Sequence, residues 1–529
     1  MKTQEFVMTI LVLGVVTWIS MAEAVVGGYT EHAHSECNLT RYPKLCAETL
    51  TVLGSGNQNV DKIVALVNKT IYETNLPRSY FSEFKTQDVQ EAHSVADYCE
   101  ELIGMSLKRL DQSHRALKSA KRNKNDIQTW LSASLTFQQS CKDHVAAHSS
   151  KLSEDNLTER LSKKMDYLSH LGSNSLALVN TMAKATISNH KLGVKEKEQE
   201  FPMWVSTKGR KLLQVVTIKA NAIVAQDGSG NYKTVSEAIE AASGTRFVIY
   251  VKKGLYKEKI RTNKDGITLI GDGKYSTLIV GDDSVANGAT LPESATFTIT
   301  GDGFIARDIG FHNTAGPEGQ QAVALNIASD RSVLYRCSIA GYQDTLYAHA
   351  LRQFYKECDI HGTIDFIFGN AAAVFQNCNL VLRRPRGGAY NAILANGRTD
   401  PGQNTGFSVH KCSITPSSDY LPVKRSFSSF LGRPWKEYSR SVVMESIIDD
   451  AIVARGWIEW PGYGSSVLRT LYFAEYNNEG PGAGTTKRVQ WPGFHVLGAD
   501  EAVKFTVGSF IAGNSWIPST GVAFTSGLD

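Results

Sequence analysis

The sequence pattern of the chain changes near residue 214, and this change limits the possible folds more than any other feature. From Arg78 to Phe201 there is no proline and very little glycine, and apolar residues recur at helical spacing. After Gln214 the chain consists of short β-rich runs separated by glycine and aspartate. Because 529 residues exceed what one hydrophobic core usually holds, we expect two domains, the first helical and the second built of strands.

The first domain, residues 30–195, is predicted to be a bundle of helices. Its apolar residues recur every three to five positions, as in Leu102, Met105 and Leu110. This spacing places them on one face of a helix, where they can pack against neighbouring helices.

Eight cysteines, four in each half of the chain, are typical of a protein that folds in an oxidising compartment. In the helical half, Cys37 and Cys46 are close enough in sequence to staple a small helical hairpin, and Cys99 with Cys141 would tie one long helix to the next. Four cysteines permit three pairings, so the other two pairings stay open.

In the second half, Cys337 and Cys358 lie 21 residues apart, about one coil of a β-solenoid. We expect these two cysteines to form a disulfide. The sequence does not decide whether Cys378 and Cys412 are bonded.

The N-terminus has the pattern of a secretory signal peptide. Lys2 is followed by an apolar run from Phe6 to Met21 and by Ala22-Glu-Ala24, which matches the small-x-small rule of signal peptidase. A membrane anchor is the alternative, but the uninterrupted apolar run is shorter than the roughly 20 residues that span a bilayer. We therefore expect residues 1–24 to be removed and the mature protein to be secreted, with no membrane contact.

Three Asn-x-Thr sequences, all in the first half, become candidate glycosylation sites once the chain is secreted. Their asparagines are Asn38, Asn68 and Asn156. Since glycans need access to solvent, we expect all three to lie on the surface.

A charged, irregular stretch, residues 196–213, is predicted to link the two domains. It passes through Phe201-Pro-Met-Trp204 and ends shortly after the basic pair Arg210-Lys211. A lone basic pair is usually part of a solvated loop without a special role. Here the pair lies between two domains of a secreted chain, so we expect a processing protease to cut at it.

The second domain, residues 214–529, is predicted to be a parallel β-helix. Gly271-Asp-Gly273 and Gly301-Asp-Gly303 lie at equivalent places beside apolar runs. A β-helix stacks coils whose inward residues form an apolar column, and its long faces offer a groove for an extended polymer. A β-sandwich is the alternative, but Asn-Gly hairpin signals are sparse and the apolar runs do not alternate strictly.

Two aspartates within apolar strands are the strongest candidates for chemistry. The sequence has no Gly-x-Ser-x-Gly elbow, His-Glu-x-x-His motif or paired Cys-x-x-Cys knuckle, which disfavours serine and zinc mechanisms. Asp344 and Asp365 lie 21 residues apart, roughly one coil, so both carboxylates would face one groove. Ile364 and Phe366 flank Asp365, and burying a carboxylate there is costly without a partner.

Like charges this close cannot both ionise easily, so the two protonation states should diverge. One carboxyl would be the acid and the other the nucleophile, kept ionised by a cation for which Arg433 is the best candidate. The alternative is that each is a structural aspartate of a solenoid turn.

Several blocks of the second half resemble the signature sequences of pectin methylesterases. They are Gly341 to Tyr347, Gly362 to Gly369, Leu431 to Arg440, Gly254 to Glu258, Asn313 to Pro317, Gln321 to Leu325, Gly397 to Asp400 and Trp491 to His495. The first half is similar to the invertase and pectin methylesterase inhibitor bundle, through its four cysteines and Phe201-Pro-Met-Trp204. The resemblance implies an all-α four-helix bundle followed by an all-β, right-handed parallel β-helix.

The resemblance also implies an activity, hydrolysis of galacturonate methyl esters in cell-wall pectin (methyl-esterified homogalacturonan), which releases methanol without a metal or organic cofactor. It makes Asp365 the nucleophile, held ionised by Arg433, and Asp344 the proton donor and then the base. Gln343 and Gln321 would donate to the developing oxyanion.

Four residues are implied to bind substrate: Thr290, Gln321, Arg433 and Trp435, the last by stacking on a sugar ring. Two positions depart from the family pattern. Leu291-Pro-Glu beside Thr290 is unusual, and Asn396 stands where relatives tend to have glutamine, which puts fine substrate contacts in doubt.

Two other functions remain as alternatives. A β-helix depolymerase also uses paired carboxylates, although the nearby glutamines and arginine favour acyl chemistry. A binding or inhibitor protein would need a defective catalytic half. A net charge of only +4 excludes a nucleic-acid partner, and the inhibitor-like half is consistent with a separate inhibitor protein as a further partner.

Overall fold

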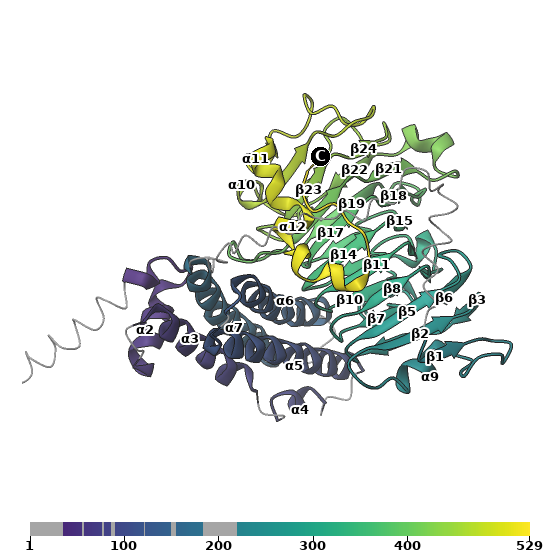
Figure 1. The fold of residues 1–529 in the computed structure, drawn as a ribbon. Coiled ribbons are helices and arrows are strands. Elements are labelled where there is room, and N and C mark those ends of the chain that lie inside the picture. The colour runs from purple at the N-terminus through teal and green to yellow at the C-terminus, as the bar shows by residue number, and fades with distance from the viewer. Residues whose placement is uncertain are drawn as a thin grey trace, which may run out of the picture. The chain divides into compact units, whose positions relative to one another are not determined.

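A computed structural model describes residues 35–54, 58–76, 79–85, 90–120, 122–149, 155–182 and 220–528. They form two compact units, one helical and one built of strands (Figure 1). The expected signal peptide and the basic pair Arg210-Lys211 lie outside the described residues, so both stay predictions. Within the ranges given above, no helix is long and apolar enough to cross a membrane.

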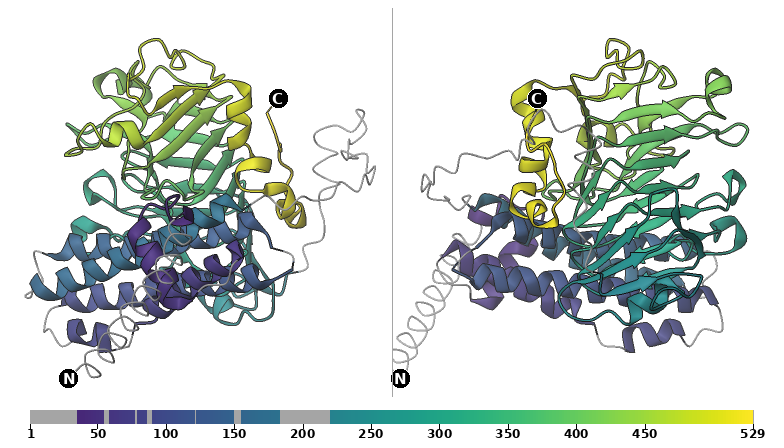
Figure 2. Two further views of the ribbon diagram at one scale, coloured as in Figure 1. Left: turned by 90° about the vertical axis from the view of Figure 1, so that its left-hand side faces the viewer. Right: turned by 45° about the vertical axis from the view of Figure 1, so that its right-hand side comes forward.

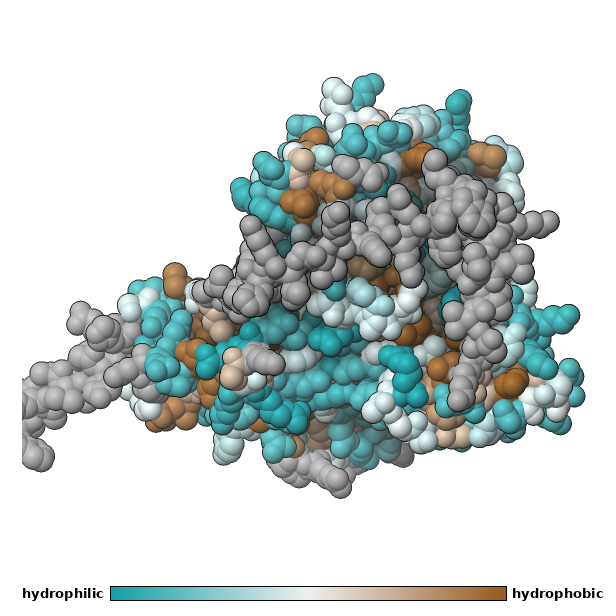
Figure 3. Space-filling model, in the orientation of Figure 1, coloured by the Kyte–Doolittle hydropathy of each residue, from teal (hydrophilic) through white to brown (hydrophobic). Residues whose placement is uncertain are grey.

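The helical unit is built on four long helices that bury their apolar faces against one another. Its helices are α2 (Pro43–Leu53), α3 (Asn59–Thr74), α4 (Ser79–Lys85), α5 (Gln90–Lys118), α6 (Lys124–His148) and α7 (Asp155–Thr181). Helix α5 contacts α6, α6 contacts α7, and α3 contacts both α5 and α7, which closes the expected four-helix bundle. On the face drawn in Figure 3, hydrophilic side chains cover most of these helices, with apolar residues in scattered groups.

Both disulfides expected in the helical unit are present. Cys37 is bonded to Cys46, and Cys99 of α5 is bonded to Cys141 of α6. The second bond joins two long helices, as the sequence predicts. Asn38 and Asn68 are exposed, although their glycosylation stays a prediction.

The strand unit is a parallel β-helix of three sheets, because successive strands of each coil belong to different sheets and pair with the next coil (Figures 1 and 2). In the described residues, the largest sheet has eleven strands: β1 (Ala222–Val224), β2 (Phe247–Val251), β5 (Ile267–Gly271), β8 (Ile305–Arg307), β11 (Ser332–Tyr335), β14 (Arg352–Lys356), β17 (Ala372–Gln376), β20 (Gly406–His410), β23 (Arg440–Met444), β25 (Tyr472–Tyr476) and β26 (Phe494–Val496). The solenoid prediction is therefore right and the sandwich alternative is wrong.

The other two sheets complete each coil. The described eight-stranded sheet contains β3 (Gly254–Lys257), β6 (Thr277–Gly281), β9 (Gly310–Asn313), β12 (Ser338–Ala340), β15 (Asp359–Gly362), β18 (Asn379–Leu382), β21 (Ser413–Pro416) and β24 (Ile447–Ile448). The described seven-stranded sheet contains β4 (Ile260–Thr262), β7 (Phe297–Ile299), β10 (Leu325–Ile327), β13 (Leu346–Ala348), β16 (Ile367–Gly369), β19 (Asn391–Asn396) and β22 (Ser429–Gly432).

Inward side chains stack in register from coil to coil and form the core. In the largest sheet, Leu334, Tyr355, Phe375 and Val409 pair directly across β11, β14, β17 and β20, and all four are buried. Helix α9 (Val235–Glu240) contributes buried residues to the first coils of this core, which protects the end of the solenoid.

The outer face of the largest sheet is also covered. Phe354 and Val374 pack there against a C-terminal segment that includes α12 (Val507–Phe510) and the side chains of Ile511 and Trp516. With both faces buried, these strands need apolar residues at successive positions, which is why their sequence does not alternate strictly.

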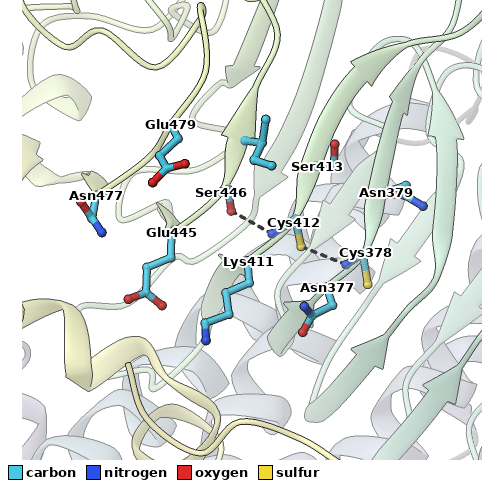
Figure 4. A pocket seen from close by; sticks show the side chains of 11 residues that line it. Asn377, Cys378, Asn379, Lys411, Cys412, Ser413, Glu445, Ser446, Asn477 and Glu479 are labelled. Carbon is cyan, nitrogen blue, oxygen red and sulfur yellow. Dashed lines mark hydrogen bonds between the residues drawn. The ribbon is translucent and has the colours of Figure 1, made fainter. Parts of the chain in front are cut away.

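The expected disulfide between Cys337 and Cys358 is wrong. Both are free thiols, and with Cys378 and Cys412 they form a buried column, one cysteine in each of four described coils. Figure 4 shows the last two, Cys378 and Cys412, in neighbouring coils. Strands stacked in register hold equivalent Cβ atoms about 4.8 Å apart, whereas a disulfide needs about 3.8 Å. The sulfurs instead contact backbone groups, as where Cys412 Sγ accepts a hydrogen bond from the Cys378 amide at 3.4 Å.

The row of inward side chains in the largest sheet includes a buried charged residue near its C-terminal end. Glu475 takes the inward position next to Val443 and is 1% exposed. Arg488 donates to it from Nε at 2.8 Å and from Nη2 at 3.1 Å, and Trp457 Nε1 donates at 3.1 Å. The guanidinium also donates to two backbone carbonyls, so both members of this ion pair are fully bonded.

We predict that Arg488→Met destabilises the strand unit by about 3–5 kcal/mol, because it leaves the Glu475 carboxylate buried without a partner. Guanidinium denaturation of the full chain measures the change. The matched control is Arg455→Met, which breaks the exposed Arg455–Glu459 pair and should cost less than about 1 kcal/mol. Equal effects of the two variants would contradict this account of the core.

Candidate active site

Stacking of the coils brings the two predicted aspartates together. Asp344 lies between β12 and β13, and Asp365 lies between β15 and β16, one coil further on. The Asp344 amide donates to the carbonyl of Ile364 at 3.0 Å, so the two turns are hydrogen-bonded to each other. Both aspartates have positive φ, 60° and 50°, and as whole residues they are 8% and 4% exposed. Aspartate tolerates this backbone conformation better than most residues do.

Arg433, which follows β22, holds Asp365 with its guanidinium. Nε lies 2.8 Å from one carboxylate oxygen, and Nη2 lies 2.5 Å from the other. The remaining nitrogen, Nη1, donates to the hydroxyl of Tyr390 at 2.6 Å, and the guanidinium lies 4.0 Å from the centre of the Trp460 ring. This two-pronged, half-enclosed geometry is the arrangement in which arginine best stabilises a carboxylate.

The two carboxyls therefore differ in their electrostatics. Burial raises the pKa of Asp365, but the hydrogen bonds and charge of Arg433 oppose that rise. Burial and the negative charge of Asp365 together raise the pKa of Asp344 well above its usual value. Among the described residues the Asp344 side chain accepts no hydrogen bond, so a proton shared by the pair favours Asp344.

Two amides face the same place with unused hydrogen-bonding groups. Gln321 and Gln343 pair as an isolated parallel bridge in adjacent coils, and Gln343 directly precedes Asp344. Neither side-chain amide is hydrogen-bonded to another described residue, and the Gln321 Oε1 atom is buried without a partner. Amides left free beside two carboxyls are suited to bind an oxygen atom of a ligand.

An aromatic surface lies on the outer face of the seven-stranded sheet. Tyr347 and Phe368 stack with ring centres 4.4 Å apart, and Trp435 meets the Phe368 ring edge-on at 6.0 Å. Trp435 needs Gly397 opposite it, because a Cβ there would lie 2.8 Å from the indole ring. The partly exposed indole is thus fixed in place, two residues after Arg433 in the chain.

Thr290 and Asn396, whose roles in substrate binding the sequence leaves in doubt, both make hydrogen bonds within the protein. The Thr290 hydroxyl donates to Glu293 at 2.7 Å, which gives it a role in its own turn. Asn396 is buried, accepts from the Arg440 amide at 2.9 Å and donates to the carbonyl of Gly369 at 3.2 Å. Asn396 therefore supports the backbone around it.

Comparison with models of protein families matches residues 221–514 to the family described as Pectinesterase. The chain belongs to the pectinesterase family. It is a carboxylic ester hydrolase that acts on pectin. Residues 32–178 match a second family, described as Plant invertase/pectin methylesterase inhibitor.

Individual relatives agree with both assignments. Probable pectinesterase/pectinesterase inhibitor 54 of Arabidopsis thaliana is 50% identical over 494 residues, which cover 90% of each chain. Pectinesterase 2 of Citrus sinensis is 45% identical over 520 residues, covering 96% of this chain and 97% of its own. A solved structure, pectin methylesterase from carrot, is 52% identical and has a TM-score of 0.58, covering 59% of this chain and 99% of the carrot chain.

Three residues of this candidate site are not predicted by the sequence: Tyr390, Trp460 and Arg383. Tyr390 and Trp460 enclose Arg433, and they come from irregular segments in which no repeat or spacing marks them. Arg383 donates from Nη1 to the carbonyl of Gly341 at 2.9 Å and from Nη2 to the hydroxyl of Tyr342 at 2.7 Å. It thereby braces the turn that leads into Gln343 and Asp344.

We predict that the Asp365→Asn variant lowers the pKa of Asp344, because the neighbouring negative charge is removed while burial stays the same. Infrared difference spectroscopy of the protonated carboxyl band, recorded against pH, measures this pKa. The double variant Asp344→Asn, Asp365→Asn identifies the band. An unchanged or raised pKa of Asp344 would show that the two carboxyls do not interact.

Proposed function

We propose that Asp365 is the nucleophile that attacks the methyl-ester carbonyl of a galacturonate unit in pectin. The observation that supports this most is the contact with Arg433, which keeps a buried carboxylate ionised and aimed in one direction. Attack forms a bond between the carboxylate oxygen and the ester carbon and gives a tetrahedral oxyanion.

Asp344 serves first as acid and then as base. Its raised pKa favours the protonated form, which can give a proton to the departing methoxide, so that methanol leaves and an anhydride joins Asp365 to the sugar. The ionised Asp344 then takes a proton from water as that water attacks the anhydride. This step releases the galacturonate carboxylate and restores both aspartates.

Gln343 and Gln321 are proposed to donate to the oxyanion from their free amides, and Trp435 to bind a sugar ring beside the reacting unit. Thr290 remains a proposed substrate contact, although its hydroxyl is engaged with Glu293. The reaction needs no metal or organic cofactor, since the two carboxyls supply both the nucleophile and the proton.

The helical unit is proposed to restrain or assist the enzyme until a protease cuts at Arg210-Lys211, outside the described residues. We propose further that the enzyme is secreted and acts in the cell wall, and that a separate inhibitor protein binds the strand unit. The match of residues 32–178 to the inhibitor family supports a regulatory role for the helices.

We predict that Asp365→Asn lowers methanol release from highly methylated pectin by about 10⁴-fold or more, because an amide cannot act as the nucleophile. The matched control is Asp308→Asn, which alters another positive-φ aspartate whose contacts are with Arg307 and Arg336 rather than the site. Full activity of the Asp365→Asn variant would show that Asp365 is not the nucleophile. If the parent enzyme instead produced new reducing ends from pectin, the activity would be that of a depolymerase.

We also predict that Gln343→Ala lowers kcat by about 10²–10³-fold with little change in KM, because the amide acts on the charge that develops in the transition state. Steady-state methanol release over a range of pectin concentrations separates the two constants. A rise in KM with unchanged kcat would instead assign Gln343 to ground-state binding.

A further inference from the structure

A polar cavity of about 520 Å³ lies on the outer face of the eight-stranded sheet. His312, Ala340 and His361 line it and lie in register on β9, β12 and β15. The residues that precede them in each strand are buried in the core, so these three face outward. Tyr342 also lines the cavity, and it stands two residues before Asp344. The cavity therefore adjoins the catalytic turn but occupies a different sheet face from the aromatic surface.

Arg383 gives this cavity a positive charge without a partner. Its guanidinium stacks on the Tyr342 ring, 3.8 Å from the ring centre, and donates only to uncharged oxygens, those of Gly341 and Tyr342. In the described part of the chain no carboxylate lies within ion-pair distance of it. Two of the five N–H groups of an arginine are engaged here, which leaves three for a ligand.

The histidines do not cancel this charge. His312 shares a hydrogen bond of 3.0 Å with the Ser338 hydroxyl, and the Nε2 atom of His361 is buried without a partner among the described residues. Burial lowers the pKa of His312 to about 4, and the charges of His361 and Arg383 add to that effect. Because positive charges on His312, His361 and Arg383 would repel one another, an anion bound between these groups would be favoured.

Of the two nearby carboxylates, Asp359 is paired with a lysine, whereas Asp419 is exposed to solvent. Asp359 accepts from Lys274 and from the Tyr275 hydroxyl, each at 2.6 Å, and Asp419 accepts from the Ser417 hydroxyl at 2.6 Å. Because its hydroxyl is anchored on Asp359, the Tyr275 ring is held at the rim of the cavity, where the residue is 57% exposed. An exposed, immobilised aromatic ring is a suitable platform for a sugar.

We propose that this cavity binds a de-esterified galacturonate unit, with its carboxylate on Arg383 and its ring against Tyr275. The inference rests on the proposed function, since ester hydrolysis creates such carboxylates on the polymer beside the catalytic turn. Charge-assisted pairing with an arginine fork distinguishes the carboxylate from the neutral methyl ester. The enzyme thereby holds an already de-esterified stretch next to the unit on which it acts.

Calorimetric titration of the full chain tests this proposal. The protein carries Asp365→Asn so that esters are not consumed, and the probes are a de-esterified and a fully methylated oligogalacturonate of equal length. We expect Arg383→Gln to weaken binding of the de-esterified oligomer about tenfold or more beyond any change in binding of the methylated oligomer. The matched control is Arg384→Gln, the exposed neighbour that does not line the cavity.

Because Arg383 also braces the catalytic turn, Tyr275→Ala provides an independent test, with Tyr72→Ala as its control at an exposed tyrosine of the helical unit. Tyr275→Ala should weaken binding of the de-esterified oligomer severalfold, while Tyr72→Ala should leave that binding unchanged. Unchanged affinity in both cavity variants, or equal loss for both oligomers, would overturn the proposal. Failure of the proposed function would appear separately, as absence of methanol release from the chain with Asp365 intact.

Discussion

In-register stacking of parallel coils is the constraint on which the rest of the structure depends. Each coil repeats the backbone path of the previous one about 4.8 Å away, so a residue type repeated at the coil spacing becomes a column. Apolar residues in such columns make the core. The same geometry places Asp344 and Asp365 side by side, although the negative charges of two ionised carboxylates would repel each other.

The fold handles buried carboxylates in two ways. Glu475 is matched by Arg488, whose donors are also used by backbone carbonyls, and the result is an ion pair with a structural role. In the pair of Asp344 and Asp365, one arginine lies near two carboxyls, and of these two it hydrogen-bonds only to Asp365. Asp344 is left without a cation of its own and keeps a proton more easily. The unequal sharing of Arg433 thus gives the two carboxyls different tendencies to hold a proton, which the proposed roles of nucleophile and acid require.

Much of this arrangement follows from the sequence, because a solenoid has a linear repeat that spacing can reveal. The 21-residue interval between Asp344 and Asp365 correctly predicts one coil. The same interval between Cys337 and Cys358 also predicts one coil, but the inferred disulfide is wrong, since being neighbours in a column is not the geometry of a bond. Spacing gives the position of a residue along the solenoid and not the distance between its side-chain atoms.

Residues in irregular segments cannot be placed from coil spacing. Tyr390 and Trp460 approach Arg433 from loops whose paths are set by packing, and no periodicity connects them to it. The bracing of Gly341 by Arg383 spans two coils and depends on a side-chain conformation. Only the resemblance points to Thr290, and its contact with Glu293 depends on the folded turn.

The most direct test of the mechanism is to trap the covalent intermediate on Asp365. The full chain turning over methylated pectin is quenched with hydroxylamine, which attacks an anhydride, and peptide mass spectrometry then locates any aspartyl hydroxamate. The account predicts this modification at Asp365, dependent on substrate and absent from Asp344. Methanol release with no modification at Asp365, under conditions that trap a reference acyl anhydride, would contradict nucleophilic catalysis and point to direct attack by water.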